Sequence, residues 1–232
     1  RLEPMLSREV AAALLLPQIT WVDGRKLCGA LSEAIRRRGG RIVEQCRVTA
    51  LIDRAGMTAG VMTEGGPVEG DGVILAAGWR SDAIAGLPGE VPACEGLRGV
   101  ILTLGMDPAA PLIRHIVKRP DGVLLPRNDG RLIVGVTRDA GRFDPEPDAG
   151  SVLSILSGAC RAVPACADLP FIEAVCRFRP YLAGGEQFIG PSRERPGLFY
   201  ALGYGANGYL RCAAGSARLT ADILRLNETA AG

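Results

Sequence analysis

The sequence "GLFYALGYGANG", residues 197–208, places an apolar run directly before a loop of three glycines, close to the carboxy-terminus. The loop fits G-x-G-x-x-G, a dinucleotide-binding pattern that also needs a preceding strand, a following helix and a second strand ending in an acidic residue. Only 24 residues follow Gly208, and they predict a single helix to about Leu226. The sequence therefore predicts a strand, a glycine loop and a helix without the remainder of a dinucleotide-binding unit, which argues against a nicotinamide enzyme.

Composition narrows the function classes. An apolar fraction of 47% and a charged fraction of 22% are ordinary for a globular protein. The net charge of +2 gives no electrostatic case for nucleic acid as a partner, and the apolar runs are too short to predict a transmembrane segment. His115 is the only histidine, which argues against most zinc sites and against triad hydrolysis, so no metal site is predicted.

The seven cysteines form no C-x-x-C pair, and their number is odd. This pattern is typical of reduced, buried thiols in a reducing compartment, so we expect a cytoplasmic location.

Hydrophobic periodicity predicts an α/β layer at the amino-terminal side. Asp23 is the expected N-cap of a helix with apolar residues at helical spacing, which ends at Gly39 and Gly40. Short strands and one buried apolar strand should follow. These strands are predicted at residues 41–46, 47–53, 59–64 and 67–79.

The middle of the chain predicts an antiparallel sheet, because its strand candidates have no helices between them and "RNDGR" is a hairpin turn. A helix over 149–163 should end at Pro164. The fold class is therefore α/β with a separate antiparallel layer. The predicted strands are 99–105, 111–119, 122–127, 131–137 and 171–182.

The buried strand in "GDGVILAAGW" ends at Ala77, Gly78 and Trp79. Ligands bind at the carboxyl ends of strands in open α/β sheets, and glycine lets a phosphate or ribose approach the backbone. A tight exit turn without a ligand explains the same residues.

The sequence "CRFRPYL" places Arg177 and Arg179 on one side of a strand. An arginine here is suited to bind a carboxylate through two hydrogen bonds, and a structural salt bridge is the alternative.

The glycine loop precedes a helix whose first N–H groups carry a partial positive charge. They could stabilise negative charge on a bound ring, or the loop is a turn that binds nothing.

Taken in order, several stretches make the chain resemble the carboxy-terminal two-thirds of the D-amino-acid-oxidase-like family of FAD-dependent oxidoreductases, most closely its glycine oxidase branch. They are "WVDGRKLCGALSEAIRRRGGRIVE", "VILAAGW", "LLPRNDGRLIVGVT", "FRPYL", "FIGP" and "GLFYALGYGANG".

The resemblance implies a partial FAD-binding Rossmann-like domain, residues 1–90 and 188–232, around an antiparallel-sheet substrate domain, residues 91–187. The two outer portions should pack together in one layer. The family's dinucleotide fingerprint lies in an amino-terminal segment that this sequence lacks, so a separate amino-terminal half or subunit is a possible partner, and FAD should bind this chain poorly alone.

The resemblance also implies the site residues. Arg179 should hold the carboxylate of a small amino or imino acid, and residues 207–210 should stabilise the reduced flavin. His115 is expected to be a strand residue and not a base. The predicted cofactor-binding residues are Val48, Ala77, Gly78 and Trp79 on the adenine–ribose side and Gly205, Ala206, Asn207, Gly208, Tyr209 and Leu210 on the flavin side.

Three positions depart from the glycine oxidase pattern. Tyr204 stands where the family has histidine, Ala206 where glycine oxidases have arginine, and Val123 where a tyrosine is expected. Of the substrate-binding set only Arg179 remains, so glycine itself is a doubtful substrate. The expected activity is FAD-dependent oxidation of a C–N bond by hydride transfer, and the alternative is a non-catalytic fragment or subunit.

Overall fold

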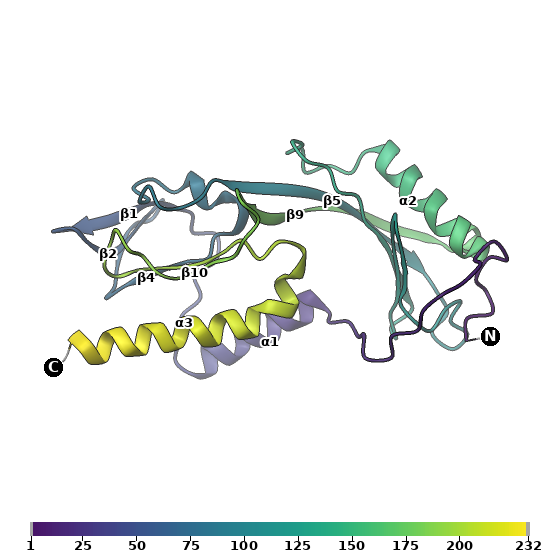
Figure 1. Ribbon diagram of the computed structural model, residues 1–232, viewed down its shortest axis with the longest axis horizontal. Coiled ribbons are helices and arrows are strands. Elements are labelled where there is room, and N and C mark those ends of the chain that lie inside the picture. The colour runs from purple at the N-terminus through teal and green to yellow at the C-terminus, as the bar shows by residue number, and fades with distance from the viewer. Residues whose placement is uncertain (1, 231–232) are drawn as a thin grey trace. The chain divides into compact units, whose positions relative to one another are not determined.

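The computed structural model describes residues 2–230, and positions 1, 231 and 232 of the predicted outer domain lie outside the described residues (Figure 1). Contacts divide the chain into two compact units. Unit 1 comprises Arg1–Trp21 and Leu97–Phe178, and unit 2 comprises Val22–Gly96 and Arg179–Gly232. The domain boundaries expected from cofactor and substrate roles stay a prediction.

Within residues 2–230 the structure contains α-helices, short 3₁₀ turns and strands. The α-helices are α1 (Gly24–Arg37), α2 (Ala149–Ala162) and α3 (Gly208–Ala230), with 3₁₀ turns at Gly78–Ala83, Pro164–Asp168 and Gly205–Asn207. The strands are β1 (Val48–Arg54), β2 (Met57–Thr63), β3 (Gly66–Glu69), β4 (Val73–Leu75), β5 (Cys94–Gly105), β6 (Val117–Arg119), β7 (Gly122–Pro126), β8 (Arg131–Gly135), β9 (Phe171–Leu182), β10 (Phe188–Pro191) and β11 (Leu198–Leu202).

Unit 1 is built on a five-stranded sheet in the order β6-β7-β8-β5-β9. The pairs β6–β7, β7–β8 and β5–β8 are antiparallel, as predicted for this region. Alternate residues face α2 and form a fully buried core, because a strand turns successive side chains to opposite faces. This core includes Val100, Leu102, Leu124, Val134 and Ala159.

Unit 2 contains two three-stranded sheets, β1-β2-β3 and β10-β11-β4. In the second, β11 and β4 are parallel neighbours, with Leu198 opposite Val73 and Tyr200 opposite Leu75. The prediction that "GLFYAL" and "VILAAG" lie in one layer is therefore confirmed. Because these strands are more than 120 residues apart in sequence, their pairing joins the two outer portions of the chain.

Local chemistry fixes helix α1 as predicted. The Asp23 side chain accepts hydrogen bonds from the backbone N–H groups of Arg25 and Lys26, at 3.1 and 3.2 Å, so it is the N-cap. The helix has no buried residue, and its apolar Leu31 and Ile35 are 53% and 47% exposed. An amphipathic helix normally buries such a face, so this side of α1 is uncovered in the chain as described.

Several local predictions were wrong. Residues 41–46 form no strand, and of the strand predicted over 111–119 only β6 is formed. His115 lies in a bend before β6, where its Nδ1 is 2.6 Å from a carboxylate oxygen of Glu3. Strand β10 was not predicted, because its pairing with β11 across a turn decides its conformation. All seven cysteines are free, but only Cys166 and Cys176 are buried.

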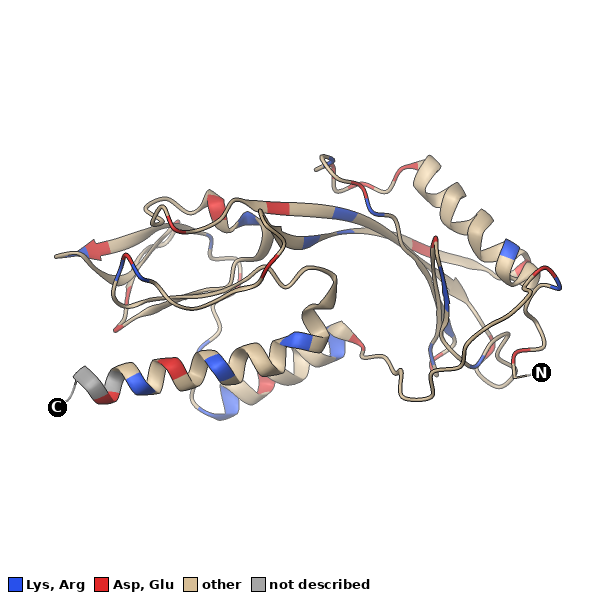
Figure 2. Ribbon diagram, viewed as in Figure 1, with Lys and Arg blue, Asp and Glu red and all other residues tan. Residues whose placement is uncertain are grey.

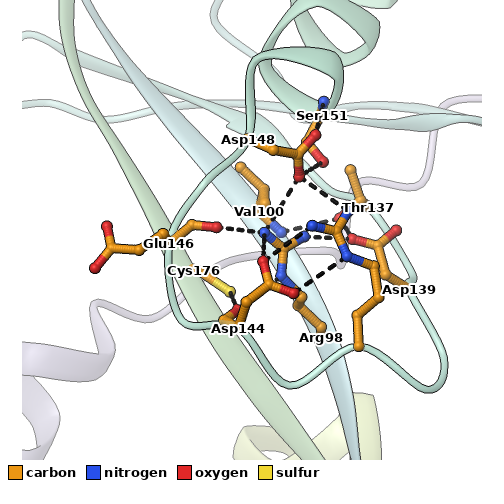
Figure 3. Close-up of polar contacts among 10 residues, drawn as sticks. Arg98, Val100, Thr137, Asp139, Asp144, Glu146, Asp148, Ser151 and Cys176 are labelled. Atoms are coloured by element: carbon orange, nitrogen blue, oxygen red, sulfur yellow. Dashed lines mark hydrogen bonds and ion pairs between the residues drawn. The ribbon is translucent and has the colours of Figure 1, made fainter.

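Unit 1 contains a fully buried arginine, Arg98, on β5 (Figure 3). Its guanidinium donates to an Asp139 carboxylate oxygen at 2.7 Å and to the backbone oxygens of Asp144 and Glu146 at 3.0 and 2.5 Å. It also lies 3.3 Å from a carboxylate oxygen of Asp148. A buried charge must be paired and hydrogen-bonded to be tolerated, and Arg98 satisfies this by fixing the loop that leads into α2.

Two carboxylates of this cluster are held in the ionised form. Asp148 caps α2, and hydrogen bonds from the backbone N–H and the hydroxyl of Ser151, at 2.9 and 2.8 Å, hold the pKa of Asp148 well below its usual value. A side-chain hydrogen bond from Arg142 lowers the pKa of Asp144. Along α3 the two signs of charge are interspersed (Figure 2).

Candidate active site

The carboxyl ends of β4 and β11 meet at one edge of their sheet, because the two strands are parallel neighbours in register. Ala77 and Gly78 follow β4, and Gly203 follows β11. This edge is where open α/β sheets bind ligands. The two candidate ligand-binding turns identified in the sequence are thus brought together within unit 2.

The turn after β4 exposes its backbone. Gly78 has φ of +68°, and a Cβ added there would meet no atom within 4 Å. The Ser81 hydroxyl donates to the Gly78 carbonyl at 2.8 Å and fixes the 3₁₀ turn that follows. Trp79 is half-buried, with the Arg80 guanidinium 4.7 Å from the centre of its ring. Open backbone at Gly78 can therefore lie close to a ligand.

The turn after β11 is compact at its start and open at its end. Gly203 has φ of +75°, and its Cβ position lies 2.8 Å from the Glu186 carbonyl oxygen. Gly205, with φ of +54°, begins a 3₁₀ turn that runs into α3 at Gly208. The free N–H groups of the first turn of α3 therefore emerge from this loop.

The remaining loop residues predicted to bind the cofactor are accessible. Ala206 and Asn207 are exposed, and Tyr209 and Leu210 are 59% and 82% exposed. The Tyr209 side chain lies against the backbone of Gly24 at the start of α1. These side chains and the backbone beside them are therefore accessible to a ligand or to further protein.

Arg179 lies near the end of β9, and the last two residues of this strand contact the glycine loop. Two residues later on β9, the Tyr181 ring lies 3.0 Å from the Cβ position of Gly205, and Leu182 lies 2.8 Å from that of Gly203. Arg179 and Tyr181 share one face of β9 because side chains alternate along a strand. Sequence reasoning missed Tyr181, although its parity with Arg179 was the available signal.

Two other residues named from the sequence, Arg177 and Val48, lie outside these two turns. Arg177, considered with Arg179, is exposed and donates to the Cys176 backbone oxygen of its own strand at 2.7 Å. Val48 begins β1 in the other sheet of unit 2 and packs against the buried cluster that contains Leu75 and Leu202. Its assignment to the adenine side stays a prediction, as do the other cofactor assignments.

A buried tyrosine hydroxyl stabilises β11, the strand that precedes the glycine loop. Tyr200 on β11 is 1% exposed, and its hydroxyl donates to a Glu90 carboxylate oxygen at 2.9 Å. Burial raises the pKa of Tyr200 to about 12, so the phenol stays protonated. Burial opposes ionisation of Glu90, but hydrogen bonds from Ser192 and Tyr200 hold its pKa below the usual value. This pairing anchors the strand that ends at the glycine loop.

Among residues 2–230, no group of three or more histidine, cysteine, aspartate or glutamate side chains is arranged to hold a metal ion. No helix within the same residues is long and apolar enough to cross a membrane.

Comparison with known proteins gives a consistent result. Residues 1–223 match the family model described as "FAD dependent oxidoreductase". The chain is 29% identical to a glycine oxidase of Geobacillus kaustophilus, over 99% of this chain and 60% of that protein. It is 30% identical to the "Bifunctional protein ThiO/ThiG" of Synechocystis sp., over 96% of this chain and 33% of that protein. The chain thus spans between a third and three-fifths of these relatives.

Solved structures agree with the sequence comparison. The crystal structure of the glycine oxidase from Geobacillus kaustophilus superimposes with a TM-score of 0.83 and 26% identity, over 90% of this chain and 56% of that one. An iminodiacetate oxidase from Chelativorans sp. BNC1 superimposes with a TM-score of 0.80 and 25% identity, over 88% of this chain and 55% of that one. The mixed fold with an antiparallel sheet is therefore confirmed.

Proposed function

The chain belongs to the family of FAD-dependent oxidoreductases, and we propose that it forms the larger part of an enzyme that oxidises the C–N bond of a small amino or imino acid. The observation that carries this proposal is the shared sheet edge of β4 and β11, where the open Gly78 turn and the glycine loop lie together. A non-catalytic role is less well supported, because several of the relatives matched over nearly the whole chain are glycine oxidases.

The residues at this edge fit a flavin dinucleotide. Gly78 leaves room where a side chain would otherwise stand, as contact with a ribose or phosphate requires. The free N–H groups at the start of α3 suit the carbonyl edge of a flavin that becomes negative on reduction. Ala77, Gly78 and Trp79 would hold the ribose side, and the backbone from Gly205 to Leu210 the flavin side.

When bound, FAD supplies the hydride acceptor, and this chain supplies positioning and electrostatics. Arg179 would fix the substrate carboxylate, and Tyr181 would hold Gly205 and its loop in place. The only histidine, His115, is hydrogen-bonded to Glu3 in unit 1, so we assign it no role as a base. Hydride transfer from the neutral amine needs little acid–base catalysis from side chains.

Replacing Arg179 with alanine is expected to lower kcat/KM for amino acids at least about tenfold, because a desolvated guanidinium–carboxylate pair contributes about 1.5–3 kcal/mol. Arg179→Lys should recover only part of the loss, since lysine cannot form the two parallel hydrogen bonds. The matched control is Arg177→Ala, which removes an exposed arginine of the same strand. Equal kcat/KM for the Arg179→Ala and parent enzymes would show that Arg179 is structural.

The substrate pocket should favour side chains larger than that of glycine. Ala206 and Val123 leave more space than the arginine and tyrosine expected from glycine oxidases, and both remaining side chains are apolar. A panel of glycine, proline, N-methylglycine, iminodiacetate and bulkier amino acids, tested on the complete gene product, ranks these substrates. Glycine as the best substrate would contradict this part of the proposal.

We further propose that additional protein completes the FAD site. Strand β4 has only β11 as a neighbour in its sheet, and Ile74 on this strand is 51% exposed. The exposed apolar residues of α1 provide a second uncovered surface in the same unit. An amino-terminal segment, continuous or separate, that adds a parallel strand to β4 would bury both and contribute phosphate-binding N–H groups.

The chain alone is therefore expected to bind FAD weakly. Equilibrium dialysis with FAD, followed by flavin absorbance, should give little retained flavin for residues 1–232 and stoichiometric flavin for the complete gene product or for the chain mixed with an amino-terminal partner. Tight, stoichiometric FAD binding by the isolated chain would contradict the need for additional protein, while leaving the oxidase assignment intact.

The seven free cysteines support a reducing, cytoplasmic location for the enzyme.

A further inference from the structure

One side chain of the glycine loop is withdrawn from solvent. Tyr204 lies between Gly203 and Gly205 and is half-buried, whereas Ala206 and Asn207 after it are exposed. The backbone of Tyr204 is helical, with φ of −70° and ψ of −17°, so the residue itself carries no backbone strain. The contacts of its side chain therefore decide what Tyr204 does for the loop.

The Tyr204 phenol lies on Gly215 of α3. Its hydroxyl oxygen stands where a Cβ of residue 215 would be, and its Cζ is 3.1 Å from that position. The Cδ1 atom of Ile189 on β10 lies at the same distance. Gly215 is buried, although Ala214 and Ser216 beside it are exposed. Residue 215 is about two turns into α3, so the Tyr204 side chain reaches from the loop past the first turn of the helix.

This contact accounts for a glycine in the interior of a helix. Glycine is less stable than alanine in a helix, because it loses more conformational freedom on folding. Gly215 is not among the residues with a positive φ, so its backbone conformation does not require glycine. Any larger side chain at this position would overlap the Tyr204 phenol. The glycine is therefore matched in size to the tyrosine.

The phenol acts by its shape and not by its charge. Burial raises the pKa of Tyr204, and the nearby Cys212 raises it further. The side chain is therefore neutral at physiological pH. A histidine, which the family has at this position, would titrate near neutral pH.

We propose that Tyr204 is a positioning residue of the cofactor site and that Gly215 provides the space that receives it. Together they fix the first turns of α3 against β10, and with them the direction of the N–H groups that emerge from the glycine loop. This inference rests on the proposed function, in which those N–H groups face the flavin. The placement of these groups then depends on the fit between one side chain and one glycine.

The first test is a compensating pair of substitutions in the complete gene product. Gly215→Ala puts a methyl group where the phenol oxygen lies, so the loop and α3 must separate, and the Kd for FAD should rise about tenfold or more. Tyr204→Phe removes that oxygen, so the double variant should return to within about threefold of the parent. Tyr204→Phe alone should change the Kd less than about twofold. Additive effects of the two substitutions would overturn the proposal.

Charge on the flavin provides a readout that a purely structural role would not move. Sulfite forms a bond to N5 of a bound oxidised flavin, and the negative charge of the adduct lies on the ring. Because helix N–H groups stabilise that charge, Gly215→Ala at saturating FAD should raise the Kd for sulfite about fivefold or more, and adding Tyr204→Phe should restore it. Unchanged sulfite affinity in Gly215→Ala would overturn the positioning role.

The matched control is Gly29→Ala, the same change in α1 at a position where a Cβ meets no atom within 4 Å. It should leave the Kd values for FAD and for sulfite unchanged. The pH profile of kcat/KM should also be the same in Tyr204→Phe as in the parent, because a neutral spacer does not titrate. A shifted profile would show that Tyr204 is an acid–base group and would overturn its role as a spacer.

Thermal unfolding separates a failure of this inference from a failure of the proposed function. In the flavin-free gene product, Gly215→Ala should lower Tm by a few degrees, and adding Tyr204→Phe should restore most of the loss. A gene product that binds no flavin would overturn the proposed function and with it the positioning role. A gene product that binds flavin but shows no rescue of Tm or of FAD affinity would overturn only the pairing of Tyr204 with Gly215.

Discussion

Replacing Arg98 with methionine is expected to lower the free energy of unfolding of unit 1 by about 3–5 kcal/mol. Arg98 is fully buried, and the substitution leaves the backbone oxygens of Asp144 and Glu146 without their donor. It also removes the cation from the Asp139 carboxylate. Urea unfolding followed by Trp21 fluorescence in a Trp79→Phe background measures this loss in unit 1 alone.

Arg142→Met is the matched control for Arg98→Met. Arg142 binds two of the same carboxylates, those of Asp144 and Asp148, but its side chain is 44% exposed. Exposed ion pairs contribute about 0–1 kcal/mol, so the control should lose far less stability. Equal losses for the two variants would show that the carboxylates, and not the burial of Arg98, determine the stability of the loop that precedes α2.

Replacing Gly203 with alanine is expected to destabilise unit 2 by about 2–5 kcal/mol. The φ of +75° is unfavourable for a residue with a side chain, and the added methyl would stand 2.8 Å from both the Glu186 carbonyl oxygen and a Leu182 methyl group. The loop must then shift away from β9. Trp79 fluorescence during urea unfolding, in a Trp21→Phe background, reports this change in unit 2.

The control for Gly203→Ala is Gly29→Ala, because Gly29 lies within α1 and a Cβ there meets no atom within 4 Å. Alanine in a helix is more stable than glycine by about 0.5–1 kcal/mol, so this variant should gain stability. The same pair tests function in the complete enzyme, where Gly203→Ala should also weaken flavin binding and Gly29→Ala should not. Unchanged flavin binding in Gly203→Ala would place the glycine loop outside the cofactor site.

Local patterns in the sequence were sufficient for much of the fold. The Asp23 cap and the apolar spacing after it determine α1. Pro164 marks the end of α2, whose C-cap is Val163. Hydrogen bonds in a helix join residues four apart, and side chains alternate in a strand, so both elements leave a short-range record in the sequence. The ordered motifs then identified the family and indicated that two distant strands share a sheet.

Long-range packing decided what the local patterns could not. Residues 41–46 contain the β-branched Ile42 and Val43 but pair with no neighbouring strand, while β10 is formed by its pairing with β11. His115 was expected in a strand, and it instead binds Glu3, 112 residues away. A strand needs a neighbour to satisfy its backbone, so its presence depends on the path of the whole chain.

The candidate site also combines features that local sequence determines with features that only long-range packing decides. The sequence by itself determined which residues are glycines, which arginine precedes proline and which motif starts the last helix. Only the tertiary structure showed that Tyr181 packs on Gly205, and that Arg98 is buried among partners 41 to 50 residues further along the chain. The physical reason is that burial and ion pairing depend on which segments meet in space, whereas caps, turns and alternation depend only on neighbours in sequence.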